Sequence, residues 1–382
     1  MGIGLVALLI LGATVQAGPA NIVWRTQTIS FEAYDATTVQ PGFALAPDGR
    51  AFAAWSHQGR MMFAELYLGV WQAPVELNAT QAWGPSLATD AAGNPHIAYY
   101  TSNGSAVLHA WREGGVWRFD LVDRTTGFYS DIEVDSQGRV HVVYSKLSPP
   151  PSQIRYALKD ASGWHVESLS TNGSSTYATD IAIGPDDTPH ITQDAYTNPT
   201  ITRTIHHWKP AGSGWMSELV DYWCAESGID VDDLGGLHVS CNDGGGHVLY
   251  YHKQGSSWIR EVIDGGTPPF LNGIPAQYTS IAVGEDRLPH LAYAWRSCGV
   301  TVYCNHVRYS AKQTEGSWIS TFVDPEGRLD GGPTIRIDDW GVPRMAYYYY
   351  QDAVTGGGLF SNDLRYAEPL AAVPGGVACI VC

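Results

Sequence analysis

A histidine recurs along this chain at one place in a repeated sequence pattern. The five copies are His96, His141, His190, His238 and His290. Imidazole nitrogens are common metal ligands, so histidines arranged around an axis could bind a metal ion. A group that recurs in every repeat usually serves every repeat, however. We therefore expect these histidines to hydrogen-bond a turn or a neighbouring repeat, and we predict neither a metal site nor a cofactor.

Polar side chains replace an aromatic residue where the pattern is broken. Three positions after the histidine most copies carry an aromatic residue, but two copies carry Gln193 and Cys241, followed by Asp194 and by Asn242 and Asp243. Sugars bind to proteins through aromatic rings that stack on the sugar and polar groups that pair with its hydroxyls. Any one of the aromatic residues could instead cap the core between repeats. We predict a carbohydrate-binding surface with these candidate contacts: Trp55, Tyr99, Asp194, Tyr222, Trp223, Asn242, Asp243, Trp295, Arg296 and Tyr349.

Two enzymatic alternatives use residues of the same sector. A polysaccharide lyase must neutralise a uronate carboxylate and move a proton, for which the candidates are Arg203, His206, His207 and Tyr222. A glycoside hydrolase needs two carboxylates about 5 to 10 Å apart, and Asp194 and Asp243 are the candidates. No catalytic signature selects either reaction. A non-catalytic binding protein is therefore the first hypothesis, and an enzyme or an envelope interaction scaffold is the alternative.

The candidate residues belong to a repeat of four short β-type segments separated by turns. The histidine positions, or their equivalents, lie 44 to 54 residues apart in successive copies, the length of a four-stranded blade. Seven copies predict an all-β, seven-bladed β-propeller, a fold that protects its strand edges by radial repetition. The last copy lacks its fourth segment, and residues 21–30 around Trp24 have that pattern. We therefore expect the N-terminal strand to complete the last blade and to close the ring.

The repeat also predicts the boundaries and the two faces of the disc. The predicted propeller spans 21–368, with blades at about 42–80, 85–123, 130–170, 179–221, 227–264, 279–324, and 333–368 plus 21–30, followed by a C-terminal tail at 369–382. We call the side on which the first strand of each blade begins the upper face. Its loops run long, whereas the turns of the lower face are short. Since function usually resides on loops held by a rigid scaffold, we expect the site on the upper face.

The two ends and the cysteines indicate an exported protein. Residues 1–17 read as a signal peptide, with an apolar run and small residues before the predicted cleavage point. Six cysteines are an even number, as expected where disulfides form. The repeat places Cys224 beside Cys241, a plausible disulfide, and Cys298 and Cys304 could close a hairpin loop. We expect a secreted or cell-envelope protein.

This repeat pattern resembles secreted bacterial seven-bladed β-propellers, broadly the sialidase-like repeat proteins and the propeller lectins. The resemblance covers about residues 21–368 and lies in the order of the repeated segments. It implies the propeller fold and, through the lectins, a glycan or polysaccharide as partner. The Phe/Tyr-Arg-Ile-Pro motif of sialidases is absent from the sequence.

Charge and hydropathy exclude other partners. The chain of 382 residues carries 22 Lys and Arg against 38 Asp and Glu, a formal net charge of −16. Nucleic-acid binding and polybasic membrane anchoring need clustered cations, which are missing. After the signal segment no apolar run reaches the roughly 20 residues that a membrane helix needs. We expect a monomer without nucleic-acid contacts and without membrane insertion.

Overall fold

The computed structural model describes most of the predicted propeller. The described residues are 22–31, 40–78, 82–101, 105–148, 152–169, 175–198, 201–265, 278–296, 305–325, 328–329, 331–351 and 361–370. The predicted signal peptide, most of the tail, and Cys298 and Cys304 lie outside them. Within the described part of the chain, no helix is long and apolar enough to cross a bilayer.

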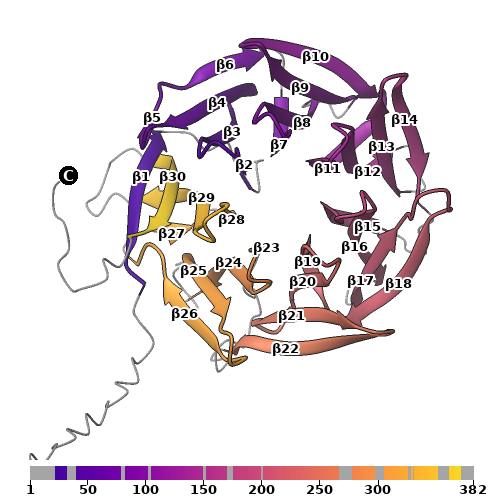
Figure 1. Cartoon of the computed structure of the whole chain (residues 1–382), viewed down its shortest axis with the longest axis vertical. Helices are drawn as coiled ribbons and strands as arrows, with labels where there is room; N and C mark the ends of the chain where they lie inside the picture. The colour runs from indigo at the N-terminus through magenta and orange to yellow at the C-terminus, as the bar shows by residue number, and fades with distance from the viewer. Residues whose placement is uncertain are drawn as a thin grey trace, which may run out of the picture.

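The strands form seven sheets arranged as blades around a central axis (Figure 1). Blades one to three are β2 (Gly42–Leu45), β3 (Ala51–His57), β4 (Arg60–Tyr67), β5 (Val70–Trp71) and β6 (Val75–Asn78); β7 (Ala82–Thr89), β8 (Pro95–Thr101), β9 (Val107–Glu113) and β10 (Val116–Asp123); and β11 (Thr126–Val134), β12 (Val140–Ser148), β13 (Gln153–Asp160) and β14 (Gly163–Ser168). Blades four to six are β15 (Ser175–Ile183), β16 (Pro189–Asn198), β17 (Ile201–Trp208) and β18 (Met216–Tyr222); β19 (Ala225–Val231), β20 (Leu237–Asn242), β21 (His247–Gln254) and β22 (Ser257–Gly265); and β23 (Thr279–Val283), β24 (Pro289–Arg296), β25 (Asn305–Lys312) and β26 (Trp318–Phe322). The all-β propeller of seven blades is thereby confirmed.

The seventh blade is built from both ends of the propeller. It contains β28 (Thr334–Ile337), β29 (Pro343–Gln351), β30 (Ser361–Pro369) and, as its outer strand, β1 (Trp24–Ser30), while the short β27 (Arg328–Leu329) pairs with the end of β29. β1 runs antiparallel to β30, with Trp24 opposite Pro369 and Thr28 opposite Arg365. Figure 1 shows the indigo β1 beside the yellow β30. The predicted closure of the ring by the N-terminal strand is confirmed.

One aromatic contact recurs at all seven interfaces between blades. A tryptophan on or beside the outer strand of each blade meets, edge to face, a ring on the third strand of the preceding blade, at centroid distances of 4.9 to 5.7 Å. Such pairs stabilise by about 0.5–1.5 kcal/mol beyond the area they bury. The pairs are Trp117 on Phe63, Trp164 on His109, Trp215 on Tyr156, Trp258 on His206, Trp318 on Tyr250, Trp24 on Tyr309 and Trp71 on Tyr366. Trp24 thus gives β1 the same packing role that the other outer strands have.

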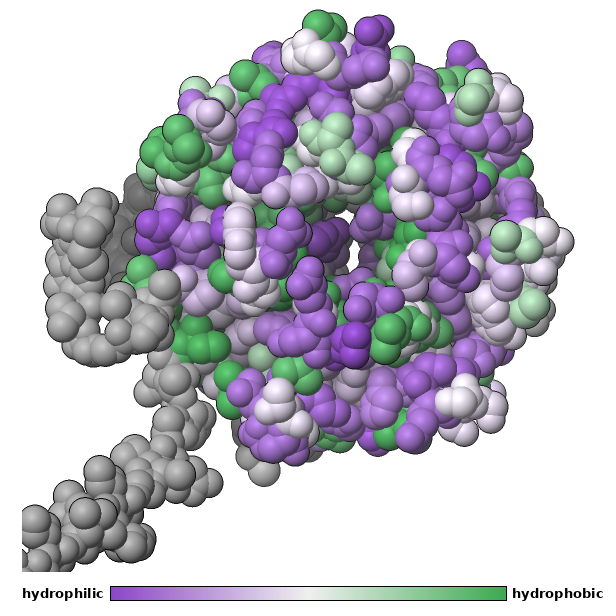
Figure 2. Space-filling view, in the orientation of Figure 1, coloured by the Kyte–Doolittle hydropathy of each residue, from purple (hydrophilic) through white to green (hydrophobic). Residues whose placement is uncertain are grey.

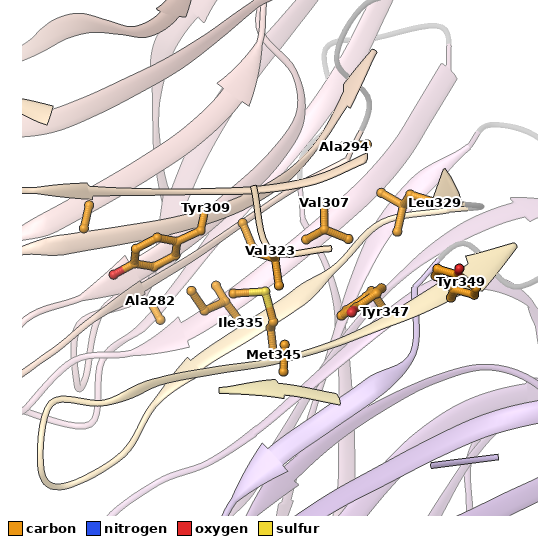
Figure 3. Packing of buried hydrophobic residues seen from close by; sticks show 13 residues of the cluster. Ala282, Ala294, Val307, Tyr309, Val323, Leu329, Ile335, Met345, Tyr347 and Tyr349 are labelled. Atoms are coloured by element: carbon orange, nitrogen blue, oxygen red, sulfur yellow. The ribbon is translucent and has the colours of Figure 1, made fainter. Parts of the chain in front are cut away.

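Between these rings and the axis, each interface is filled by apolar side chains from two blades. In the cluster between blades six and seven, Val307 and Tyr309 of β25 face Ile335, Met345 and Tyr347 of blade seven (Figure 3). Met345 and Ile335 are completely buried. The blades are therefore held by continuous core packing, which gives the loops a rigid base.

The recurring histidines hold the strands and turns within their own blades. The ring of His141 contacts the Tyr156 hydroxyl at 2.7 Å and the carboxylate of Asp135, in the preceding turn, at 2.9 Å. His238 makes the same contact with the Tyr250 hydroxyl. The expected structural role, bonding a turn, is thus seen directly. Among the described residues, no three His, Cys, Asp or Glu side chains gather as a metal site.

Candidate functional site

The first strand of each blade borders the central channel and contributes two channel positions. In each first strand, one apolar residue pairs with a residue of the second strand. That partner is the residue directly following the histidine position. We call the residue before the apolar residue the upper channel position and the residue after it the lower channel position. The upper position holds Gly42, Ser86, Asp131, Asp180, Gly228, Ser280 and Thr334. The lower position holds Ala44, Ala88, Glu133, Ala182, Asp230, Ala282 and Arg336.

Side chains at these positions bind the next blade. An Asp131 oxygen accepts the backbone N–H of Ile181 at 3.1 Å, and an Asp180 oxygen accepts that of Ile229 at 2.8 Å. Asp230 likewise accepts a backbone N–H of the next blade, at 2.7 Å. The first strand is a sheet edge whose N–H groups lack strand partners, so these bonds satisfy donors that would otherwise be buried without acceptors.

The upper ends of the first strands enclose a cavity of about 410 Å³ at the mouth of the channel. Its wall includes Ser86, Asp131, Asp180, Ser280, Thr334 and Arg336. In the space-filling view, hydrophilic residues border the opening near the middle of the disc (Figure 2). A cavity of this size, open at one end, accommodates one or two sugar rings.

The rim of the cavity is formed by residues with an unusual backbone. Tyr129, Glu226 and Tyr278, each three residues before the apolar residue of its first strand, line the cavity with φ angles of 50°, 53° and 60°. Gly84 occupies the same position in blade two with φ 55°. Side chains other than glycine are strained in this left-handed region, and such strain clusters at ligand-binding sites. The rim therefore marks the cavity as a candidate functional site.

The carboxyl groups around the cavity hold their protons unusually tightly. Burial, together with the neighbouring carboxyl of Asp131, raises the pKa of Asp180 well above its ordinary value. The Asp131 carboxyl contributes because two neighbouring carboxylates disfavour being ionised together. Burial raises the pKa of Glu226 to about 7, with a further contribution from Asp194. Deeper in the channel, burial raises the pKa of Glu133 to about 8.

Arg336 is the one cationic side chain that lines the cavity within the described residues. Its guanidinium donates to the carbonyl oxygen of Ile335 at 2.9 Å. It interacts electrostatically with Glu133, Asp180 and Asp230 of three blades. Arginine presents five N–H donors, so Arg336 retains donors for a ligand.

Asp194, expected from the sequence to contact a ligand, reaches the cavity wall from β16. One of its oxygens accepts the hydroxyl protons of Thr204 and Ser227, both at 2.8 Å, and the other accepts the Ser227 N–H at 3.1 Å. Only 1% of the residue is exposed, and burial raises its pKa to about 6. Asp194 therefore holds the first residues of β19 in place. Both of its carboxylate oxygens already accept hydrogen bonds from the protein, so few acceptor sites remain for a ligand.

The aromatic candidates divide into buried and exposed residues. Trp55 and Tyr99 are 1% exposed and Tyr349 is 6% exposed, so these rings pack in the core between blades, and the expectation that they face a ligand is wrong. Tyr222 and Trp223, at the entry to blade five, are 52% and 54% exposed. These two rings remain available on the upper face.

The other binding candidates lie at the upper ends of blades five and six. Trp295 is half-buried with the Arg308 guanidinium 4.9 Å from its ring centroid, and Arg296 ends β24. Asn242 is buried and donates to the carbonyl of Ala225 at 3.1 Å. The carboxylate of Asp243 contacts the ring of His247 and accepts backbone N–H groups of its own loop. Trp295, Asn242 and Asp243 do not line the channel-mouth cavity.

The lyase candidates are not assembled around an open space. His206 and His207 are each 1% exposed. The ring of His206 stacks between His190 and Trp208, and His207 contacts the side chains of Gln193 and Ser217, both at 2.7 Å. Buried imidazoles with these partners cannot reach a polysaccharide. The expectation that these histidines take part in proton transfer is therefore wrong.

A disulfide and a polar pair explain the breaks in the repeat that suggested a polar sector. Cys224 and Cys241 form the predicted disulfide, which joins the entry of β19 to β20. Cys241 thus replaces the usual aromatic residue because it is cross-linked, and Gln193 replaces it because it pairs with His207. Both substitutions serve the blade itself.

Sequence reasoning missed the channel residues, although a signal was present. From the sequence, we considered departures from the repeat in the second strand of each blade. The residues that line the channel instead depart from the repeat in the first strand. Four copies have alanine at the lower channel position, and the others have Glu133, Asp230 and Arg336. Since a small residue suffices between blades there, the three charged residues stand out once the first strands are aligned.

Comparisons with known proteins support the fold. No protein-family model matches the chain, and no curated protein matches its sequence. Among solved structures, a Hadza microbial sialidase has a TM-score of 0.51 and 11% identity, covering 81% of this chain and 73% of that one. A mutant Aleuria aurantia lectin in complex with Fucα1-6GlcNAc has a TM-score of 0.50 and 13% identity, covering 76% and 97%. The same lectin in complex with α-methyl-L-fucoside gives 0.50 and 12%, covering 76% and 96%. At these identities the likeness concerns the propeller fold alone.

Proposed function

We propose that this chain is an exported carbohydrate-binding propeller that holds a saccharide in the channel-mouth cavity without cleaving it. The lining of that cavity is the observation that carries the proposal: tyrosine rings at the rim, and carboxyl, hydroxyl and guanidinium groups on the wall. A sugar hydroxyl both donates and accepts, so it can pair with a carboxylate and with Arg336 together. The likeness in fold to fucose-binding lectin structures supports the same ligand class.

The exposed pair Tyr222 and Trp223 extends this surface across the upper face. Both rings are about half exposed and directly precede the disulfide-anchored entry of blade five. Large exposed aromatic rings are costly in solvent and commonly mark binding surfaces. In a longer glycan they would contact residues beyond the one seated in the cavity.

The experiment that tests this function is a glycan array with the purified chain, followed by titration of the best hit. Tyr129→Ala removes a rim ring that is 38% exposed, and Arg336→Met removes the cation at the wall. Each variant should weaken binding about 10-fold or more, as expected for the loss of a stacking ring or a charged donor. Trp340→Ala is the matched control, since this ring is 70% exposed at the lower end of the blade-seven first strand.

An array without any hit above background would count against the proposal, as would variants that bind as well as the unchanged chain. The same samples show whether the bound saccharide is cleaved. Release of reducing ends would replace the binding role with hydrolysis. In that case the hydrogen-bonded pair Asp131 and Asp180 would be the first residues to substitute.

A further inference from the structure

The channel-mouth cavity has an excess of acidic groups over its single cation. Asp131, Asp180, Asp194 and Glu226 line it together with Arg336. Glu133 and Asp230 lie just below, at the lower channel position. A narrow opening with walls of low dielectric constant concentrates the field of such groups. An ammonium group that enters the cavity favours the ionised form of these carboxyls, whereas an anionic sugar opposes it, so the cavity prefers positive charge.

Arg336 has further hydrogen-bond donors at the same cavity. Its guanidinium donates to the backbone carbonyl oxygen of Ile335 at 2.9 Å. Arginine presents five N–H donors, so the other donors of Arg336 can bind a hydroxyl group of a ligand.

Resting on the proposed function, we propose that the saccharide bound in the cavity carries a free amino group, as in deacetylated chitin fragments. The protonated amine pairs with the Asp131 and Asp180 carboxyls and with Glu226, while neighbouring hydroxyls accept from Arg336. The ammonium supplies the positive charge that the cavity lacks, and the hydroxyls supply the acceptors. Acetylation of the nitrogen removes that charge, so an N-acetylated sugar loses the charge-assisted bonds.

Binding of a cation has a measurable consequence for the protons of the cavity. Burial raises the pKa of Asp180 well above its ordinary value and raises the pKa of Glu226 to about 7, so Glu226 is largely protonated at about pH 6. An ammonium group beside them favours the charged carboxylates, so protons leave the protein as the ligand binds. The heat of binding then depends on the ionisation enthalpy of the buffer. A neutral sugar bound through hydroxyls alone gives no such dependence.

The test is calorimetric titration of the full chain with chitotriose and, separately, with its fully N-acetylated form, at about pH 6, below the usual pKa of an amine. The double variant Asp131→Asn with Asp180→Asn keeps amide oxygens that can accept the N–H groups of the next blade, so the ring is preserved. Asp233→Asn is the control, because this exposed carboxylate pairs with Arg287 on the lower face. Thermal unfolding of each variant verifies the fold.

We expect chitotriose to bind at least about 10-fold more tightly than the acetylated trimer, with proton release. Both the preference and the proton release should disappear in the double variant and persist in Asp233→Asn. Equal affinity for the two trimers, weakened by Tyr129→Ala, would overturn the amine inference and leave the carbohydrate function standing. Spermidine competing as tightly as chitotriose would overturn the requirement for a sugar. Failure of every saccharide to bind would overturn both proposals.

Discussion

Glu133 gives the channel a stability that falls as pH rises. Burial raises its pKa from 4.5 to about 8, so between these values the folded chain keeps a proton that the unfolded chain has lost. The contribution is complete below about pH 4.5 and is lost as pH rises through about 8. At about 1.4 kcal/mol per pH unit, the upper limit is about 5 kcal/mol. Channel water reaches this half-buried group, so we expect about 1–3 kcal/mol.

The substitution Glu133→Gln isolates this effect because glutamine has the same shape and no charge. The variant should match the unchanged chain at about pH 5 and exceed its free energy of unfolding by about 1–3 kcal/mol at about pH 8.5. Urea unfolding followed by tryptophan fluorescence measures both proteins across this range. Glu315→Gln, at an exposed hairpin turn, is the control. If the free energies of unfolding of the two proteins differ by the same amount at every pH in this range, the reasoning about a proton held in the channel is refuted.

The disulfide, the ring closure and the buried histidines each allow a further test. Replacing both Cys224 and Cys241 by serine should lower the free energy of unfolding by about 2–4 kcal/mol, measured by urea unfolding; an unchanged midpoint would contradict a stabilising bridge. Trp24→Ala removes the contact with Tyr309 and should cost about 2–4 kcal/mol while hydrogen exchange of β1 accelerates; exchange confined to another blade would argue against the closure. His206→Ala should reduce stability by about 1–3 kcal/mol without changing glycan affinity per folded molecule, whereas a selective loss of affinity would restore a role in ligand binding.

The fold was predictable because each blade repeats the same physical solution. The alternation of apolar and polar residues, the turn residues and the outer-strand tryptophan recur seven times, so errors in one copy are corrected by the others. Even Trp24, far from its blade in the sequence, could be assigned because its segment matched the missing strand. The disulfide followed from the same geometry, since it placed Cys224 beside Cys241.

The site was harder to predict because exposure is decided by neighbouring blades. Trp55 and Tyr99 have the same chemistry as an exposed sugar-stacking ring, and only the packing of the next blade buries them. The left-handed backbone of Tyr129 falls in a register shift of β11 that the repeat pattern does not reveal. Charged residues such as Arg336 had a readable signal, because they replace alanine in an otherwise regular column of the repeat.

Closure of the ring by β1 and β30 also controls when the chain can finish folding. Arg25 of β1 pairs with Glu368 of β30, a separation of 343 positions. During synthesis β1 emerges before the other described strands, and it has no strand partner until β30 is made. A prematurely terminated product leaves β1 unpaired and the tyrosine partner of Trp24 uncovered. The closing strand therefore acts as a check on completeness, since a broken chain exposes surfaces that proteases and chaperones recognise.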